Sequence, residues 1–505
     1  MTPMPQTGRH ILRNAHVIDP ANGVDAVTDV VIADGKVAAV GAQAPDPAAA
    51  ETDLAGCWLS PGWVDIHVHA YGTLGFADPD SIGVYQGVTS FVEAGGPGID
   101  TLDEFFAMMD GLTTDLYVGP FIRPMGLIGL HFIEGKVRSL GNVPIARWMD
   151  LVQERRDSLR YLKANAVGDY GTGALKVAKG LSEILDLPLY MHVGEFQQQR
   201  PKHLLAYDAY RLAEEGDIVT HLYHNNLGRV LDENGKVFPV VRDAEARGVL
   251  FDLGFGGYNF AWDVAENAFD QGLLPHTISS DLQQFNVVRP TKSLANVMTV
   301  CLRLGMTVGQ VIERVTANAA RAIRMTDRAG ALTPGMPADI TVFRLEKGEF
   351  ELNDCATAVR KADTAFVPVM TFKNGVRYDA DLARGQDERN WFLQVAEDEV
   401  PPAAAALSPA QRDFLGALGT ALEGVEWKMT AAEFLEIDDA IRLQEAFRRV
   451  QAAAGLPLAD ALRAAYAAFL TSPFPMQIGL LLLRLDRRFA IGRLAEVANQ
   501  RPLAA

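Results

Sequence analysis

The stretch Pro61-Gly-Trp-Val-Asp-Ile-His67-Val-His69 is the part of the sequence that is most informative about the fold. Its apolar residues predict a strand over residues 64–69, and residues two apart in a strand point to the same side. Both imidazoles can therefore reach one metal ion. A histidine pair at the end of a strand suits a barrel whose strand ends form the active site.

Further ligand-type side chains follow short apolar runs along the chain. His192, His221 and Asp281 each come directly after such a run. Together with His67 and His69, they place five metal-binding residues at the ends of four expected strands. Ordinary buried polar groups do not explain this convergence, so the sequence predicts a metal site.

Between about residues 60 and 325, short apolar runs alternate with amphipathic stretches. The expected strands are 64–69, 90–94, 160–165, 189–193, 218–222, 250–253 and 277–280. Strands alternating with helices over about 250 residues predict a parallel sheet and suit a (β/α)8 barrel. A doubly wound sheet has the same local pattern, but no Gly-x-Gly-x-x-Gly follows the first strand. We therefore predict an α/β fold with a TIM-like barrel over residues 61–329.

Strand-rich segments flank this middle part. The first covers residues 10–17 and 29–32, and the second covers residues 338–343 and 367–378. Asp-Gly at 34–35 and Asn-Gly at 374–375 are typical of tight hairpin turns. We predict a small composite β-sandwich domain built from residues 1–60 together with 330–390.

Beyond about residue 395 the sequence becomes Ala-rich and helical. Ser408-Pro409 is typical of a helix start, and residues 430–433 form a capping box. We expect a helical extension over residues 395–505 with three to five helices and no catalytic motif. Apolar positions such as Phe414 and Leu418 are expected to pack on the barrel or on a sister subunit in a homo-oligomer. A substrate lid and a partner-binding module are the alternatives.

Composition limits the classes of function. The chain has 505 residues, 49% hydrophobic and 22% charged, with 46 Lys and Arg against 63 Asp and Glu, a net charge of −17. This composition is typical of a globular protein and excludes wholesale disorder. The acidic balance argues against binding to nucleic acid or to anionic membranes, which needs clustered Lys and Arg. The expected partner is a small-molecule substrate.

Three cysteines, at positions 57, 301 and 355, lie far apart without a C-x-x-C motif, which favours a reducing compartment. Residues 1–10 have no apolar core of the kind that a signal peptide needs. The apolar run at 479–483 is far shorter than the roughly 20 residues that span a bilayer. We therefore expect a cytoplasmic protein.

The motifs together resemble the amidohydrolase superfamily. The resemblance rests on residues 61–69, then His192, His221 and Asp281 in that order, and on the stretch 332–342. Within the superfamily, the chain most resembles the amidohydrolase/deacetylase-type metallohydrolases, which are dihydroorotase-like. That closer likeness is carried by residues 87–90, 191–195, 249–254 and 274–281, and the resemblance covers roughly residues 8–385.

The resemblance implies two divalent metal ions, usually zinc, bridged by a carboxylated lysine. It implies that His67, His69 and Asp281 bind the more buried metal, and that His192 and His221 bind the other.

Lys163 matches the position of the family's bridging lysine. The interval from Lys163 to His192, 192 − 163 = 29 residues, leaves room for one loop and one helix. Burial near a metal lowers the pKa of an amine, so the neutral form that reacts with carbon dioxide becomes accessible. Lys176, in a helical stretch, is the alternative lysine, and Glu93 is the reserve candidate for a bridging ligand.

The implied reaction is hydrolysis of an amide or an acetyl ester of a small molecule. A metal-bridging hydroxide would be the nucleophile and Asp281 the general base and then acid. A cyclic amidohydrolase of the dihydroorotase or hydantoinase type needs the same metal core and is the alternative. A catalytically inactive scaffold is a further alternative, but it would have eroded ligands, and the full set is present here.

Substrate-binding residues are expected on two loops after the strands. His224 and Asn225 lie just beyond His221, where they could donate hydrogen bonds. Tyr258 and Asn259 follow the flexible turn at 254–257. We expect these four residues to contact the substrate.

The chain departs from its relatives at two positions near the expected pocket. Phe255 and the pair Gln283-Gln284 stand where the relatives commonly carry histidine. These departures leave the metal set intact but leave open the substrate and the choice between amide, ester and cyclic amide. Arg123 and Arg289 could hold a substrate carboxylate, although a surface role is the stronger expectation.

Overall fold

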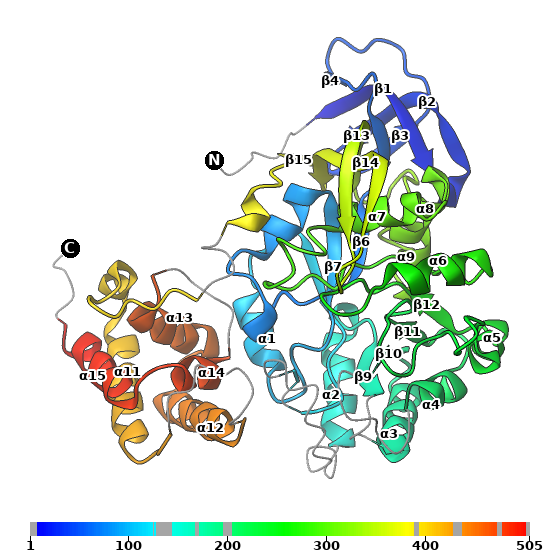
Figure 1. The fold of residues 1–505 in the computed structure, drawn as a ribbon. Coiled ribbons are helices and arrows are strands. Elements are labelled where there is room, and N and C mark those ends of the chain that lie inside the picture. The colour runs from blue at the N-terminus through cyan, green and yellow to red at the C-terminus, as the bar shows by residue number, and fades with distance from the viewer. Residues whose placement is uncertain are drawn as a thin grey trace.

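The computed structural model describes residues 8–124, 126–127, 144–166, 171–194, 205–387, 393–427, 437–471 and 477–500. It shows a mixed α/β arrangement with a β-sheet at one end, parallel strands with surrounding helices in the middle, and a helical extension to one side (Figure 1).

Strands from both flanks of the middle part form one eight-stranded sheet (Figure 1). Its order is β15-β14-β13-β5-β1-β2-β3, and β4 pairs with β1. The strands are β1 (Arg9–Asp19), β2 (Val24–Ala33), β3 (Lys36–Val40), β4 (Ala50–Asp53), β5 (Trp58–Pro61), β13 (Ile340–Asn353), β14 (Val359–Lys373) and β15 (Val376–Asp379). β5 joins the two flanks, because it pairs with β1 on one side and with β13 on the other.

The two expected hairpin turns are present in this sheet. Asp34 and Gly35 have φ of 50° and 74°, and Asn374 and Gly375 have φ of 49° and 77°. These left-handed pairs match the turn that connects right-twisted strands. The sequence pattern missed β4 and β5 and underestimated β13, whose second half is polar and largely exposed.

The middle of the chain contains two parallel sheets. The first has the order β6-β7-β8 and the second β12-β11-β10-β9. The strands are β6 (Trp63–Val68), β7 (Val88–Glu93), β8 (Asp115–Val118), β9 (Leu162–Ala166), β10 (Leu189–Val193), β11 (Ile218–Thr220) and β12 (Leu250–Asp252). Their side chains are almost all buried, as expected for parallel strands covered on both faces.

Isolated parallel bridges lie between the neighbouring edges of these sheets. They join Val118 to Leu159, Phe121 to Lys163, Asp252 to Thr277, and Val68 to Leu282. Over the described residues, the strands do not form one continuous sheet, so the closed eight-stranded barrel stays a prediction.

Two details of the expected strand pattern were wrong. The short strand β8 was not among the expected strands. The sequence pattern also predicted a strand over 277–280, where the structure has only one bridge, at Thr277. The reason is local: the Ser279 hydroxyl and the Ser280 amide donate to buried carboxylates of other strands.

Nine helices accompany the strands over the described part of the middle region, several of them visible around the parallel strands in Figure 1. They are α1 (Leu102–Met108), α2 (Ile145–Arg155), α3 (Gly171–Ile184), α4 (Leu205–Leu212), α5 (Pro239–Ala246), α6 (Trp262–Asp270), α7 (Leu294–Arg303), α8 (Val308–Val315) and α9 (Ala317–Ala322). One large hydrophobic cluster runs through these helices and strands.

The helical extension has a core of its own. Its described helices are α11 (Pro409–Glu423), α12 (Ile437–Ala454), α13 (Leu458–Phe469), α14 (Ile478–Leu483) and α15 (Arg487–Asn499). Ser408 caps α11 in a capping box with Gln411, as the Ser-Pro signal indicates, whereas the capping box at 430–433 lies outside the described residues. Phe414 and Leu418 are buried in the extension's own cluster.

The extension packs against α1 (Figure 1). The Gln444 amide of α12 and the backbone N–H of Ile478 both donate to the buried carboxylate of Glu104. The Tyr466 hydroxyl of α13 lies 3.4 Å from the sulfur of Met108.

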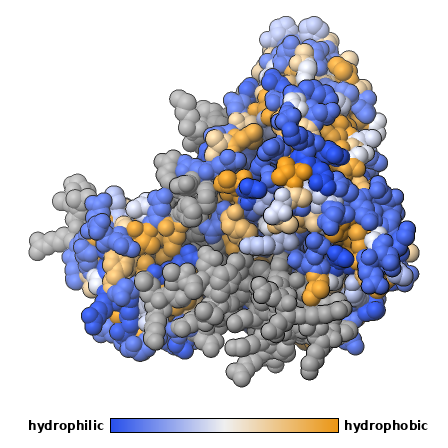
Figure 2. All heavy atoms as spheres, in the orientation of Figure 1, coloured by the Kyte–Doolittle hydropathy of each residue, from blue (hydrophilic) through white to orange (hydrophobic). Residues whose placement is uncertain are grey.

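The visible face of the molecule is mostly hydrophilic over the composite sheet, and apolar residues gather in smaller groups, one of them on the extension (Figure 2). Among the described helices, none is both long and apolar enough to cross a membrane.

Candidate metal centre

The residues that the sequence predicts as metal ligands meet in one pocket. All six are buried, and each stands in or just after a parallel strand or at the bridge that follows. The pocket is lined by these six and eight further residues: His67, His69, Lys163, His192, His221, Asp281, Leu74, Leu127, Asn165, Gly257, Tyr258, Asn259, Gln283 and Phe285.

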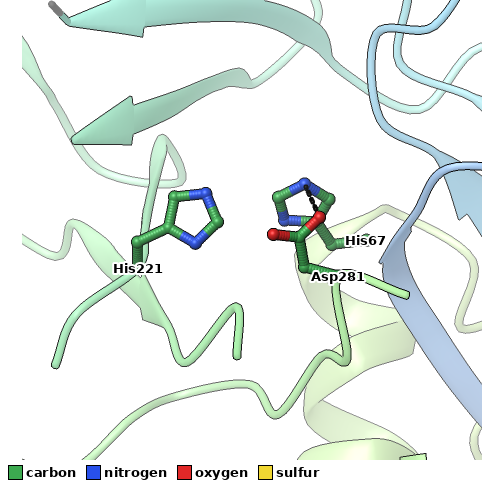
Figure 3. A group of neighbouring side chains, drawn as sticks. All are labelled: His67, His221 and Asp281. Atoms are coloured by element: carbon green, nitrogen blue, oxygen red, sulfur yellow. Dashed lines mark ion pairs between the residues drawn. The ribbon is translucent and has the colours of Figure 1, made fainter. Parts of the chain in front are cut away.

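Short distances connect the ligand atoms. Nε2 of His67 lies 3.4 Å from Oδ1 of Asp281, and Nε2 of His69 lies 3.3 Å from the same oxygen. Nζ of Lys163 lies 3.2 Å from Nε2 of His67. Figure 3 shows Asp281 beside His67, with the ring of His221 opposite, and one donor atom from each of these three lies within 4.8 Å of the others.

The backbone aims two of these side chains. His221 and Asp281 have φ of 70° and 49°, in the left-handed region that costs an ordinary residue about 1–3 kcal/mol. The amide of Asp281 donates to the carbonyl of His67, which fixes the end of β6 beside it. Gly256 makes room, because a Cβ there would lie 2.3 Å from Oδ2 of Asp281.

Three of the imidazoles have Nδ1 engaged by the protein. Nδ1 of His67 lies 3.0 Å from the Tyr190 hydroxyl, and that of His221 lies 2.7 Å from the carbonyl of Gly254. Nδ1 of His69 lies 3.3 Å from the carboxylate of Glu93. Each arrangement leaves Nε2 as the ring atom that can bind a metal ion.

Glu93 holds the loop after β6 rather than lining the pocket. Its carboxylate accepts hydrogen bonds from the backbone N–H groups of Ala70, Tyr71 and Gly96, at 2.6, 2.8 and 2.9 Å. The same carboxylate also contacts Nδ1 of His69 and orients that ring. The reserve role that the sequence gave to Glu93, as a bridging ligand, therefore has no support in this geometry.

A second buried carboxylate, Asp252, supports the site through Tyr190. The sequence pattern did not predict this role. Asp252 accepts hydrogen bonds from four hydroxyl groups at 2.6–2.7 Å, those of Tyr190, Thr220, Thr277 and Ser279. Because the Tyr190 hydroxyl donates to Asp252, its oxygen accepts from Nδ1–H of His67. The available signal was polar residues inside otherwise apolar runs.

Burial and neighbouring charges set the protonation of the ligands. Burial and the nearby Lys163 lower the pKa values of His67 and His192 well below the usual histidine value. Burial and the neighbouring His192 do the same for His221. These rings are neutral, which is the form that binds metal.

The pKa values of Lys163 and His69 are shifted in opposite directions. Burial lowers the pKa of Lys163 to about 7, so its uncharged amine is accessible near neutral pH. Burial also acts to lower the pKa of His69, but hydrogen bonds to Asp281 and Glu93 outweigh it and raise that pKa to about 9. A proton on His69 balances two carboxylates, and a bound cation can take the place of that proton.

The residues present fit a divalent metal centre. Neutral imidazoles with Nδ1 already engaged, a carboxylate and a deprotonatable lysine are nitrogen and oxygen donors of the type that zinc accepts. The direct contacts between the His67 and His69 nitrogens and Asp281 are also the contacts that a shared cation would replace.

Two of the four expected substrate residues line the pocket. The rings of Tyr258 and Phe285 lie 5.7 Å apart with their planes tilted by 44°, and both side chains are partly exposed, at 52% and 37%. Asn259 is buried and donates to Oδ2 of Asp281 at 3.3 Å. Gln283, which the sequence noted only as a departure from its relatives, donates to Oδ1 at 2.7 Å.

The other two expected substrate residues lie elsewhere. Neither His224 nor Asn225 is among the described residues that line the pocket. Nδ1 of His224 accepts the N–H of Asn226, and burial lowers the pKa of His224 to about 3. The side-chain oxygen of Asn225 accepts from Arg229. Both side chains bond within their own loop, and their contact with a substrate stays a prediction.

The remaining candidates are also accounted for. Lys176 lies exposed on α3 on the outside of the strands. Within the described part of the chain, Arg123 and Arg289 are absent from the pocket lining. Three further histidines have no partner pattern in the sequence and are expected to be structural or surface residues; one of them, His276, accepts the N–H of Phe251 at Nδ1. His131 and His203 lie outside the described residues.

Comparisons with known sequences point in one direction. A family model described as "Amidohydrolase family" matches residues 262–377. A deacetylase of Brucella anthropi is 31% identical over 358 residues, covering 68% of this chain and 86% of that protein. A deacetylase of Agrobacterium fabrum is 32% identical over 355 residues, with 68% and 84% covered. A dihydroorotase of Solibacter usitatus is 25% identical over 415 residues, with 70% and 92% covered.

Solved structures give the same picture. An adenine deaminase matches with a TM-score of 0.67 and 28% identity, covering 74% of this chain and 100% of that one. A dihydroorotase matches with the same score and identity, covering 74% and 98%.

Proposed function

The chain belongs to the amidohydrolase superfamily, and on that premise we propose that it is a binuclear metal-dependent hydrolase that removes an acyl group, such as acetyl, from a small molecule. Membership makes it an enzyme, a hydrolase acting on C–N bonds. The observation that carries the proposal is the meeting of six buried ligand-type side chains in one pocket.

We assign the ligands as follows. His67, His69 and Asp281 would hold one cation, and His192 and His221 would hold the other. Lys163, once carboxylated on Nζ, would supply a further ligand to both, and its pKa of about 7 supports this role because carbon dioxide reacts only with the neutral amine. Zinc is the proposed metal, because imidazole and carboxylate are its common protein ligands.

Two divalent cations bound there would supply a hydroxide at neutral pH and polarise the scissile carbonyl. The residues of the chain carry out the proton transfer. The carboxylate of Asp281 accepts the proton of the attacking water and returns it to the leaving nitrogen or oxygen. The amides of Asn259 and Gln283 hold that carboxylate from both sides.

The pocket stands at the carboxyl ends of the parallel strands, where barrel enzymes carry their active sites. We propose that β6 to β12 and the segment around Thr277 close into a (β/α)8 barrel over residues 61–329, in support of which the bridges to Thr277 and Leu282 connect the sheet edges. The composite sheet of residues 1–60 and 330–390 and the extension of residues 395–505 are proposed as separate domains. No described residue of the extension lines the pocket, which supports a packing role over that of a lid.

A cyclic amidohydrolase remains the second candidate, supported by the similarity to a dihydroorotase. Opening a ring needs the same metal core, so only the pocket loops distinguish the two. The deacetylase reaction is preferred because the relatives of that name are more similar, at 31% and 32% against 25% identity.

A substrate panel tests the proposal. The zinc- and bicarbonate-supplemented protein is assayed with N-acetyl amino acids, O-acetyl hydroxy acids, hydantoins and dihydroorotate. Turnover of acetyl compounds with none of the rings supports a deacetylase. Turnover of the rings alone would overturn it in favour of the cyclic amidohydrolase.

A further inference from the structure

Two carboxamide side chains hold Asp281 from opposite sides. Nε2 of Gln283 donates to Oδ1 at 2.7 Å, and Nδ2 of Asn259 donates to Oδ2 at 3.3 Å. Because an ionised carboxylate only accepts hydrogen bonds, it fixes which end of each amide faces it. The amide nitrogens face Asp281, and the carbonyl oxygens stand on the other side.

Those two carbonyl oxygens are buried without a hydrogen-bond partner among the described residues. The side chains belong to residues that are only 4% and 8% exposed, and both line the pocket. A buried acceptor left unpaired costs about 1–3 kcal/mol, so native sites rarely leave such atoms without a partner. Two unpaired acceptors near Asp281, the proposed proton-transfer group, are suited to a ligand that has hydrogen-bond donors.

Neighbouring residues hold Gln283 and Asn259 in place beside Asp281. The Asn286 side chain accepts the N–H of Gln283 and donates to the carbonyl of Asp281, which fixes the Gln283 turn. Gly256 lets Asn259 approach, because a Cβ there would lie 2.8 Å from Nδ2 of Asn259. The Thr291 hydroxyl holds the carbonyl of Gly256.

We infer that Asn259 and Gln283 select substrates by accepting a hydrogen bond from the N–H of the scissile bond, so that the enzyme cleaves secondary amides in preference to esters. The inference rests on the proposed function and narrows it. The leaving nitrogen must come close to Asp281 to receive its proton, and each carbonyl oxygen is bonded to the same carbon as the amide nitrogen that touches Asp281. An ester presents only a lone pair there and leaves the acceptors unpaired.

The reaction is a hydrolysis in which the C–N bond breaks and water adds across it. The hydroxide oxygen becomes part of the carboxylate product, and the proton held by Asp281 goes to the leaving nitrogen. The N–H that Asn259 and Gln283 accept remains on the amine throughout. Their role is substrate selection at the scissile bond, without proton transfer.

The test compares matched amide and ester substrates. For wild type, Asn259→Leu and Gln283→Met, kcat/KM is measured on an N-acetyl compound and its O-acetyl counterpart, each relative to its rate with free hydroxide. Both substitutions preserve side-chain size while removing the acceptor. Gln284→Met, at the next residue and outside the described pocket lining, is the matched control. Metal content and thermal melting are recorded for every variant.

We expect the amide-to-ester preference to fall about tenfold or more in both variants and to stay unchanged in the control. Equal losses on amide and ester would mean that the two residues only position Asp281, and would overturn the inference. Turnover of neither substrate by the metal-loaded wild type would count against the proposed function instead.

A binding measurement decides the matter even if a variant fails to fold or to bind metal. Calorimetry on the wild-type protein compares a phosphonamidate with the phosphonate that differs only by oxygen in place of N–H. Binding about tenfold or more tighter for the N–H compound supports the inference. Equal affinity overturns it.

Discussion

The hydroxyl of Tyr190 lies 3.0 Å from Nδ1 of His67 and connects that ring to the buried carboxylate of Asp252. This contact fixes the ring so that Nε2 faces the pocket. A metal ligand oriented in this way needs no reorganisation when a cation arrives, and such supporting contacts typically contribute 10–100-fold in metal affinity.

Replacing Tyr190 with Phe therefore weakens metal binding. We expect the zinc affinity to fall about 10–100-fold, measured by competition with a coloured chelator. Tyr161→Phe is the control, because the Tyr161 ring stacks on Tyr190 while its hydroxyl donates to the backbone of Ile66. Equal affinities for Tyr190→Phe and wild type would show that the contact does not orient the ligand.

Asp281→Asn separates metal binding from proton transfer. The amide oxygen still offers a ligand atom, so the variant keeps much of its metal, whereas kcat falls about 10²–10⁴-fold because no base accepts the proton. Metal analysis and steady-state kinetics on one preparation check both statements. Turnover close to wild type would remove Asp281 from the role of general base.

Lys163→Met tests the bridging lysine. We expect the variant to bind one cation where the wild type binds two, and to gain nothing from added bicarbonate. With ¹³C-labelled bicarbonate, the wild type gives a carbamate signal by NMR and the variant gives none. Lys176→Met, on the exposed face of α3, is the control and should retain both the signal and the metal. A carbamate signal that persists in Lys163→Met would contradict the assignment.

Docking of the helical extension depends on pH through Glu104. Burial raises the pKa of Glu104 from 4.5 to about 7 in the folded protein. Between these values the folded state binds more protons at Glu104 than the unfolded state does, so the stability that Glu104 contributes is fully present below pH 4.5 and is lost as the pH rises through 7. The shift is equivalent to on the order of 3 kcal/mol.

Urea unfolding of the full chain between pH 5 and 8 measures this dependence. Glu104→Gln removes the titrating group, keeps an acceptor for Ile478 and should flatten the curve. Asp103→Asn, a neighbouring carboxylate that is 73% exposed on its side chain, should leave the curve as in wild type. An unchanged pH dependence in Glu104→Gln would show that another group controls it.

The sequence predicted six residues that share one buried pocket, and the prediction has a physical reason. Two histidines two residues apart in a strand must point the same way, and strand ends in a parallel arrangement face one edge. His192, His221 and Asp281 could be placed by the same rule. Resemblance was needed only to choose Lys163, which the structure puts 3.2 Å from His67.

The parts that could not be predicted depend on contacts between distant segments. Nothing local in the sequence shows that Glu93 orients His69 or that Asp252 accepts hydrogen bonds from four hydroxyls on three other segments. His224 shows why the role of a loop residue is hard to predict from sequence. It stands at the expected loop, but its bond to Asn226 makes it part of the loop's own structure. A polar residue in a loop can contact a ligand or stabilise the loop itself, and only the three-dimensional structure shows which of the two it does.

Metal stoichiometry tests the binuclear centre most directly. The protein is purified without chelators, supplied with zinc and bicarbonate, freed of excess metal and analysed for metal per chain alongside its acetyl-hydrolase activity. We predict two zinc ions per chain and activity that is lost when a chelator removes them. Fewer than one metal per chain, with no hydrolysis of any compound in the panel, would contradict the binuclear hydrolase and leave the chain as a scaffold.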